Sequence, residues 1–214
     1  MAQNKTFYSI IKKVIMSLTG LFLISFLVVH MSGNLLLFKD DGGAAFNAYA
    51  KFMSTNPIIG IMEYGLAAGF LFHIVDGFIL WVQNRRARPV KYAVQKASPA
   101  SSFASRNMGI SGSILLIFLV IHLKNFFVEH RVLGNETPMY DLVAQAFSNP
   151  YYSAMYVAAM VGLGMHLAHG FSSAFQTLGL RHKSYFWLIR AVGLIFSIAV
   201  PAGFASMPIY FLFQ

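Results

Sequence analysis

The sequence predicts an all-α integral membrane protein, a single bundle of five transmembrane helices, and three observations support this prediction. Hydrophobic residues make up 57% of the 214 residues and charged residues only 11%, whereas a soluble domain has roughly 25% charged residues. The apolar residues gather into five runs, each long enough to cross the hydrocarbon core as a helix. The connections between these runs are short and hold most of the charges, so we expect one domain over residues 1–214.

The first apolar run covers about residues 14–38 and begins after Lys12 and Lys13. It is too long for the hydrophobic region of a signal peptide, and no cleavage site of small residues follows it, so we expect a first transmembrane helix here. Backbone groups inside lipid must bond to one another, which makes each further run a helix as well. We expect the four remaining transmembrane helices at about residues 57–81, 108–128, 151–178 and 186–212.

The basic residues are divided unequally between the two ends of this expected bundle. Twelve of the 16 Lys and Arg residues fall in the N-terminal tail, in the loop at 82–107, and around the turn that opens the last helix. Cytoplasmic loops carry such an excess of basic residues, so we expect a cytoplasmic N-terminus and a C-terminus on the opposite side. The net charge of +9 therefore reflects membrane orientation, and we expect no binding to nucleic acid.

Five of the seven histidines lie inside the expected transmembrane helices: His30, His73, His122, His166 and His169. An ionisable side chain is costly inside a bilayer and by default marks a functional site, although a single membrane histidine often serves only a hydrogen bond between helices. The first four helices each supply one histidine, and the fourth supplies a second. His166 and His169 share one helix face, so periodicity does not decide between them.

The histidines fall at two depths when residues are counted from the outer end of each helix. His30 lies nine residues before Lys39, and His122 lies seven residues before Glu129, which is roughly 10–14 Å. His73 and His166 each lie 16 residues after the proline that opens their helix, roughly 24 Å. A haem iron with two axial imidazoles requires one histidine from each of two facing helices. We therefore expect two b-type haems, a distal one at His30 and His122 and a proximal one at His73 and His166.

Glycines flank both histidines of the deeper pair at offsets of four residues. They are Gly69 and Gly77 in the second helix and Gly162 and Gly170 in the fourth. Glycine leaves room for a broad macrocycle to approach the backbone, while close packing between membrane helices is the alternative explanation. The outer pair has Phe26, Asn34, Phe118 and Phe126 at the same offsets, and these aromatic residues could line a haem edge or face lipid.

Two other roles for the histidines compete with haem ligation. Zinc prefers four ligands that converge tetrahedrally at about 2 Å, which histidines on two levels roughly 10 Å apart do not provide. A proton relay would combine the histidines with Glu63, Asp76 and Glu129, since histidine titrates near neutral pH. The sequence links these groups into no single path, so the three acids and His169 are only weak candidates for proton transfer.

With these residues in place, the chain resembles the cytochrome b membrane anchor of succinate:quinone oxidoreductases and fumarate reductases, in its five-helix, di-haem, single-subunit form. The resemblance covers the whole chain and rests on KKVIMSLTGLFLISFLVVHMSGNLL, FHIVDGFILWVQNRRARP, IHLKNF and MHLAHGFSSAFQTLGL. The last stretch is the most specific, and its Gly170 and Gly179 match the family pattern with His166, rather than His169, as the ligand. The family pairs its first helix with the third and its second with the fourth, which implies the same two axial pairs.

The resemblance also implies partners for the chain. A flavoprotein subunit would oxidise succinate or reduce fumarate, an iron–sulfur subunit would exchange electrons with this anchor, and a membrane quinone, menaquinone by resemblance, would be the other substrate. The chain has no cysteine and so holds no iron–sulfur cluster itself. The resemblance places the protein among membrane lipid in the bacterial cytoplasmic membrane, in the respiratory chain and tricarboxylic acid cycle, with the basic face as the docking surface and a higher-order oligomer as one possible assembly.

Two further functions fit some of the same residues. The chain could be a haem-binding electron carrier with a different partner, or a transporter with histidines in its pathway. The transporter hypothesis predicts a colourless purified protein, whereas both haem hypotheses predict a coloured one.

Overall fold

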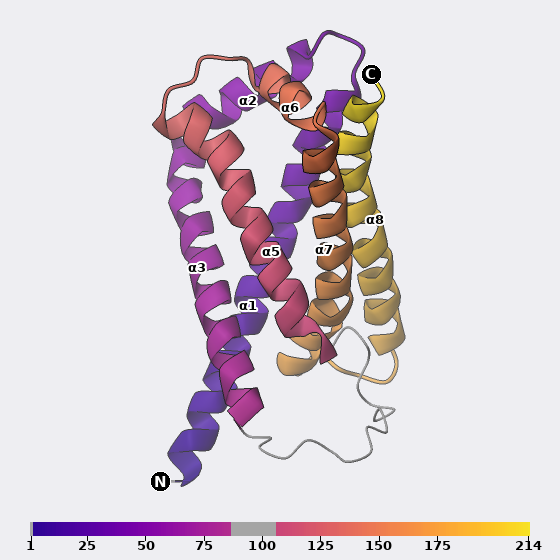
Figure 1. Cartoon of the computed structure of the whole chain (residues 1–214). Coiled ribbons are helices and arrows are strands. Elements are labelled where there is room, and N and C mark those ends of the chain that lie inside the picture. Colours follow the sequence, from indigo (N-terminus) through magenta and orange to yellow (C-terminus); the bar gives the residue numbers. More distant parts are fainter. Residues whose placement is uncertain (1, 87–105) are drawn as a thin grey trace.

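The computed structural model describes residues 2–86 and 106–214, and these residues form an all-α bundle without strands (Figure 1). Five segments are long and apolar enough to cross a membrane, which confirms the predicted fold class. The helices that form them are α1 (Ala2–Asn34), α3 (Pro57–Arg86), α5 (Met108–His122), α7 (Pro150–Thr177) and α8 (Phe186–Leu212). Three basic residues of the expected cytoplasmic loop, Arg88, Lys91 and Lys96, lie outside the described residues.

The five membrane spans end within five residues of the expected positions. The first membrane span runs to Phe38 because a 3₁₀ turn, η1 (Leu35–Phe38), continues α1, and α3 extends five residues beyond the expected end at 81. Arg85 and Arg86 occupy the last turn of α3, where positive charge complements the helix dipole. Helix α7 begins at Pro150, where the Asn149 side chain accepts hydrogen bonds from the backbone N–H groups of the first turn.

Large apolar side chains cover the outside of the bundle. The exposed fractions are 73% for Ile61, 63% for Phe72, 64% for Ile117 and 66% for Ile195. Soluble proteins rarely expose contiguous apolar surface of this kind, whereas lipid chains solvate it at no cost. This surface explains how the helices remain stable although few of their residues are fully buried.

The third membrane span changes its helical type directly after His122. Helix α5 is continued by a π-helix, η2 (Leu123–Val132), and the backbone N–H of Leu133 bonds to the carbonyl of Val128 at 2.9 Å. A π-helix has wider turns than an α-helix and is frequent at functional sites. We expected this span to end at residue 128, but the helical segment continues for four more residues, to Val132.

Two short helices that the sequence analysis did not predict close one end of the bundle (Figure 1): α2 (Ala44–Thr55) and α6 (Met139–Phe147). We call this end the capped end. Its core is built from side chains of these helices and of the spans beneath them: Leu37, Phe46, Val143, Phe147, Tyr156, Met207 and Phe211. With 12 and 9 residues, the two helices are too short to cross a membrane.

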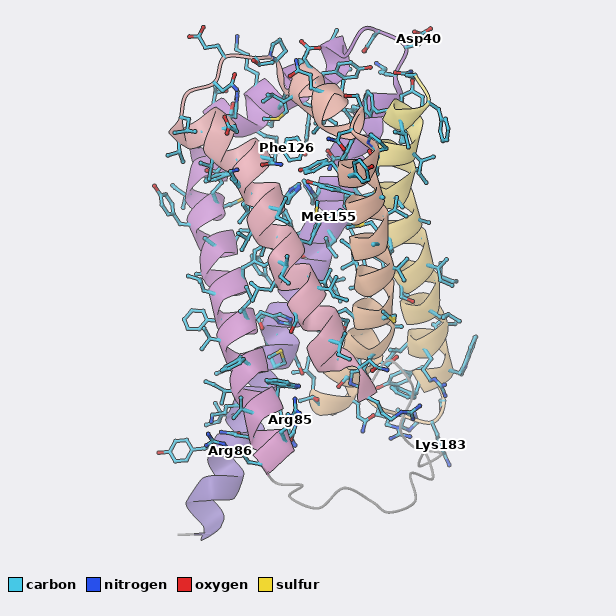
Figure 2. All side chains as sticks on the ribbon, viewed as in Figure 1. Asp40, Arg85, Arg86, Phe126, Met155 and Lys183 are labelled. Atoms are coloured by element: carbon cyan, nitrogen blue, oxygen red, sulfur yellow. The ribbon has the colours of Figure 1, made fainter. Side chains whose placement is uncertain are left out.

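The two ends of the bundle differ in the balance of their charged side chains. Arg85, Arg86 and Lys183 lie at the end where the N-terminus emerges, and Asp40 lies at the capped end (Figure 2). We call the first of these the basic end. The separation supports the orientation expected from the sequence, with the basic end toward the cytoplasm.

Candidate functional site

The structure brings His30 of α1 and His122 of α5 together in the half of the bundle nearer the capped end. Their ring centres are 5.9 Å apart and the ring planes stand at 82°. Both side chains are partly buried. Two residues separated by 92 positions in the sequence thus face each other across the interior of the bundle.

A second facing pair lies nearer the basic end. His73 of α3 and His166 of α7 have ring centres 6.1 Å apart and ring planes at 68°. The first helix is therefore paired with the third span and the second with the fourth, as the depth count expected. Within the described residues, the partly buried His169 forms neither a hydrogen bond nor a ring contact.

The spacing of both pairs fits a metal ion held between two imidazoles. Two metal–nitrogen bonds of about 2 Å each, with about 1 Å from each nitrogen to its ring centre, give a separation of about 6 Å. Nearly perpendicular ring planes suit this geometry because each imidazole rotates freely about its bond to the metal. Among the described residues, no group of three His, Asp or Glu side chains converges on one point. Two-coordinate ligation, as haem iron requires of the protein, fits the site, and tetrahedral zinc does not.

Hydroxyl groups contact both rings of the pair nearer the basic end. Nδ1 of His73 lies 3.2 Å from the Thr19 hydroxyl, and Nδ1 of His166 lies 3.4 Å from the Ser111 hydroxyl. Each hydroxyl also has a backbone carbonyl of its own helix within reach as an acceptor for its proton. In the tautomer with the proton on Nδ1, each ring donates to the hydroxyl oxygen, and the lone pair of Nε2 is available for a metal.

A chain of side-chain hydrogen bonds reaches His122 from the π-helix. The Asn125 amide donates to the Tyr152 hydroxyl at 2.9 Å, Tyr152 donates to Tyr156 at 3.0 Å, and the Tyr156 hydroxyl lies 3.0 Å from Nδ1 of His122. The Tyr156 oxygen keeps one lone pair and one proton, so its bond to His122 suits either tautomer. In the metal-ligating tautomer, His122 donates and Tyr156 accepts.

His30 is the exception among the four rings. The Asn34 amide nitrogen lies 3.3 Å from its Nε2, across one helical turn. Ligation through Nε2 therefore requires the partly buried Asn34 side chain to turn away, whereas Nδ1 of His30 has no hydrogen-bond partner in the described part of the chain.

Aromatic side chains enclose the pair nearer the capped end. Phe26 stacks on His30 with ring centres 5.2 Å apart, and Phe118 stacks on His122 at 5.6 Å. Phe126, labelled in Figure 2, adds a third ring 5.3 Å from His122. The sequence left open whether these aromatic residues line the site or face lipid, and in the structure they line the site.

The glycines beside the deeper pair serve mainly helix packing. A Cβ atom on Gly69 would lie 2.7 Å from the Phe22 ring, and one on Gly162 would lie 3.2 Å from Ile114. Gly77 meets Met16 in the same way, and only Gly170 has no atom within 4 Å of its Cβ position. The close-packing explanation therefore holds for three of the four glycines.

Four residues of the site were not predicted from the sequence: Thr19, Ser111 and Tyr156, which contact the histidine rings, and Tyr152, which bonds to Tyr156. A sequence signal exists only for the two tyrosines, which lie four residues apart on one face of α7. Two further glycines, which were not predicted to belong to the site, approach the histidine rings. Cβ atoms on Gly20 and Gly112 would lie 3.4 and 3.8 Å from the rings of His73 and His166.

The three acids considered for proton transfer lie apart from one another. Glu63 forms an exposed ion pair with Arg131 at 3.0 Å, and Arg131 also donates to the Ser54 carbonyl. Asp76 is buried, and its Oδ2 atom has no hydrogen-bond partner among residues 2–86 and 106–214. No contact joins these groups or Glu129 to the histidine rings in the described ranges.

Comparisons with protein-family models, with curated proteins and with solved structures found no match for this chain. The assignment of a function therefore depends on the two facing histidine pairs and on the groups that bond to them.

Proposed function

We propose that the protein is a di-haem cytochrome b, the membrane anchor of a succinate dehydrogenase or fumarate reductase, which carries electrons between an iron–sulfur subunit and membrane quinone. The observation that carries this proposal is the presence of two facing histidine pairs, 5.9 and 6.1 Å apart between ring centres, at two depths of one membrane bundle. The resemblance of the sequence to this family agrees with the proposal.

Each part of the proposed sites has a physical task. His30 with His122, and His73 with His166, would supply the axial ligands, and bound haem would supply one-electron transfer along the bundle. The hydroxyls of Thr19, Ser111 and Tyr156, three acceptors for Nδ1–H, orient the rings and raise their strength as donors. The surrounding helices exclude water.

The proposed partners follow from what this chain lacks and from where its charge lies. It has no cysteine for iron–sulfur ligation, so the centre that exchanges electrons with it belongs to another subunit. The excess of Lys and Arg at the basic end suits the docking of extrinsic iron–sulfur and flavoprotein subunits. Quinone is the proposed substrate within the membrane.

The test is the haem content of the purified protein together with its reduced-minus-oxidised spectrum. We expect two b-type haems per chain in the wild type and one in each of His30→Ala, His73→Ala, His122→Ala and His166→Ala. The double variant H30A/H122A should keep one haem because both substitutions affect the same site. The double variant H30A/H166A should lose both.

The control for these variants is His169→Ala, which should retain both haems. A colourless wild-type protein, or haem that survives all four ligand replacements, would contradict the proposal and favour a transporter. The role as an anchor has its own test, which is succinate-dependent quinone reduction by membranes that contain the chain. Haem binding without that activity in the presence of co-purifying subunits would favour an electron carrier with a different partner.

A further inference from the structure

Two adjoining cavities lie beside the connection between α7 and α8 at the basic end. The first has a volume of about 450 Å³ and is lined by Arg181, Lys183, Phe186, Trp187 and Arg190. The second has a volume of about 280 Å³ and is lined by Ala168, Ser172, Arg190, Ala191 and Leu194. They share Arg190, so together they form one site with a basic part and a mainly apolar part.

The basic part has no counter-charge from the described residues. Arg181, Lys183 and Arg190 are all exposed and form no ion pair there. Of the seven acidic residues in the sequence, four lie in the connections on the capped side, and Glu63 and Glu129 lie near the capped-side ends of α3 and η2. The seventh, Asp76, is buried in α3, and the cation that acts on it is Lys12. Among the described residues, the three cations therefore remain available to an anionic group of a bound molecule.

The apolar part extends from these cations along the membrane-facing surface of the two helices. Arg190 lies about 6 Å along α8 from its first residue, and Leu194 lies one turn farther, at about 12 Å. On the other helix, Ala168 lies about 14 Å before the last residue of α7. A soluble protein that docks on the end of the bundle does not reach this depth, whereas the acyl chain of a lipid does.

Aromatic residues place the basic part at the level of lipid headgroups. The Trp187 side chain is 67% exposed, and its indole N–H donates to the Ser184 carbonyl at 3.1 Å. The guanidinium of Arg181 lies 5.1 Å from the ring centre of Phe186. Exposed tryptophan is enriched at membrane interfaces, and arginine stems extend along apolar surface while their charge stays in the polar layer.

We infer that this site binds an anionic phospholipid, with the phosphate group held by Arg181, Lys183 and Arg190 and one acyl chain lying along Ala168, Ala191 and Leu194. Basic pockets between membrane helices on the cytoplasmic side bind anionic headgroups in this way. The inference does not depend on haem or on the proposed enzymatic role, since it uses only the α7–α8 surface.

The test measures the binding of phosphatidylglycerol to the purified, delipidated full-length chain in detergent, with thermal stability as the readout. Phosphatidylglycerol should raise Tm, and phosphatidylcholine should not. In the triple variant R181Q/K183Q/R190Q we expect the apparent affinity for phosphatidylglycerol to fall on the order of 100-fold, because each cation contributes about fivefold.

A matched control removes the same charge from the same end of the bundle. The triple variant K13Q/R85Q/R86Q lies outside both cavities and should bind phosphatidylglycerol as the wild type does. The acyl-chain part has its own pair of variants. Ala191→Leu fills the second cavity and should weaken binding without any change in charge, while Ala199→Leu, on the exposed surface of the same helix, should not.

Three outcomes would overturn the inference. Equal loss of binding in the two triple variants would show a diffuse effect of surface charge. An equal rise in Tm from inorganic phosphate, with no effect of Ala191→Leu, would show a site for free phosphate. Unchanged lipid binding in R181Q/K183Q/R190Q, combined with loss of extrinsic subunits from the purified complex, would show a protein-docking surface.

Discussion

The Nδ1 atom of His122 lies 3.0 Å from the hydroxyl oxygen of Tyr156. This contact joins α5 to α7 and connects the histidine pair nearer the capped end to the hydrogen bonds of Tyr152 and Asn125. The pair nearer the basic end is held differently, by single hydroxyls of Thr19 and Ser111. The two proposed haem sites therefore differ in the groups that control their ligands, and each can be altered separately.

The substitution Tyr156→Phe should raise the midpoint potential of the proposed distal haem. Without an acceptor for Nδ1–H, His122 becomes a weaker electron donor and stabilises the ferric state less. A hydrogen bond worth about 0.5–1.5 kcal/mol corresponds to a shift of roughly 20–65 mV for one electron. Redox titration of the haem absorption band measures this shift, and the second transition should stay in place.

The matched variant for the other site is Ser111→Ala, which should shift only the proximal transition. Equal shifts of both transitions in either variant would indicate a general loss of structure. Unchanged potentials in both variants would show that these hydroxyls do not act on the ligands.

The turn before α2 should be sensitive to substitution at Gly43. This residue has φ = +82°, and a Cβ atom on it would overlap the Tyr140 ring. Gly42 has φ = +64° but no atom within 4 Å of its Cβ position. Gly42→Ala should therefore cost only the strain of the left-handed conformation, about 1–2 kcal/mol, whereas Gly43→Ala should cost more because of overpacking.

Thermal unfolding of the two glycine variants in one detergent provides the comparison. The lower Tm should belong to Gly43→Ala, and the added substitution Tyr140→Ala should restore part of its loss. Equal Tm values for the two variants would show that Tyr140 moves aside without cost.

A buried hydrogen bond should anchor α6 to the start of α7. The hydroxyl of Ser153, which is 2% exposed, donates to the Phe147 carbonyl at 2.7 Å. Ser153→Ala leaves that carbonyl unsatisfied in a buried position and should destabilise the fold by about 1–3 kcal/mol. Ser148→Ala removes an exposed bond of similar length to Gln145 and should change stability by less than about 0.5 kcal/mol. Denaturant titration of both variants measures the difference, and a larger effect at Ser148 would contradict it.

The ion pair between Glu63 and Arg131 should contribute little to stability or to quinone chemistry. The two side chains are 35% and 38% exposed, and such pairs are worth about 0–1 kcal/mol. Glu63→Gln should therefore leave Tm nearly unchanged and, in the proposed enzyme, leave quinone turnover at the wild-type rate. A variant with full haem content but lost turnover would instead identify Glu63 as part of the proton path.

The sequence by itself determined the number of membrane spans, the separation of charge between the ends and the two levels of histidines. The physical reason is that lipid admits only backbone bonded within helices and penalises isolated polar side chains. Under these constraints, the spacing of His30, His73, His122 and His166 along their helices translates directly into depth.

The tertiary structure alone decided which side chains touch the histidine rings. Thr19 lies 54 positions from His73, and Ser111 lies 55 positions from His166. Such contacts depend on how each helix is rotated and tilted against its neighbour, and apolar residues all around a membrane helix leave that rotation undefined in the sequence. The short helices of the capped end have the same origin, since Phe46 and Phe147 become core residues only where the ends of the spans give them a surface to pack on.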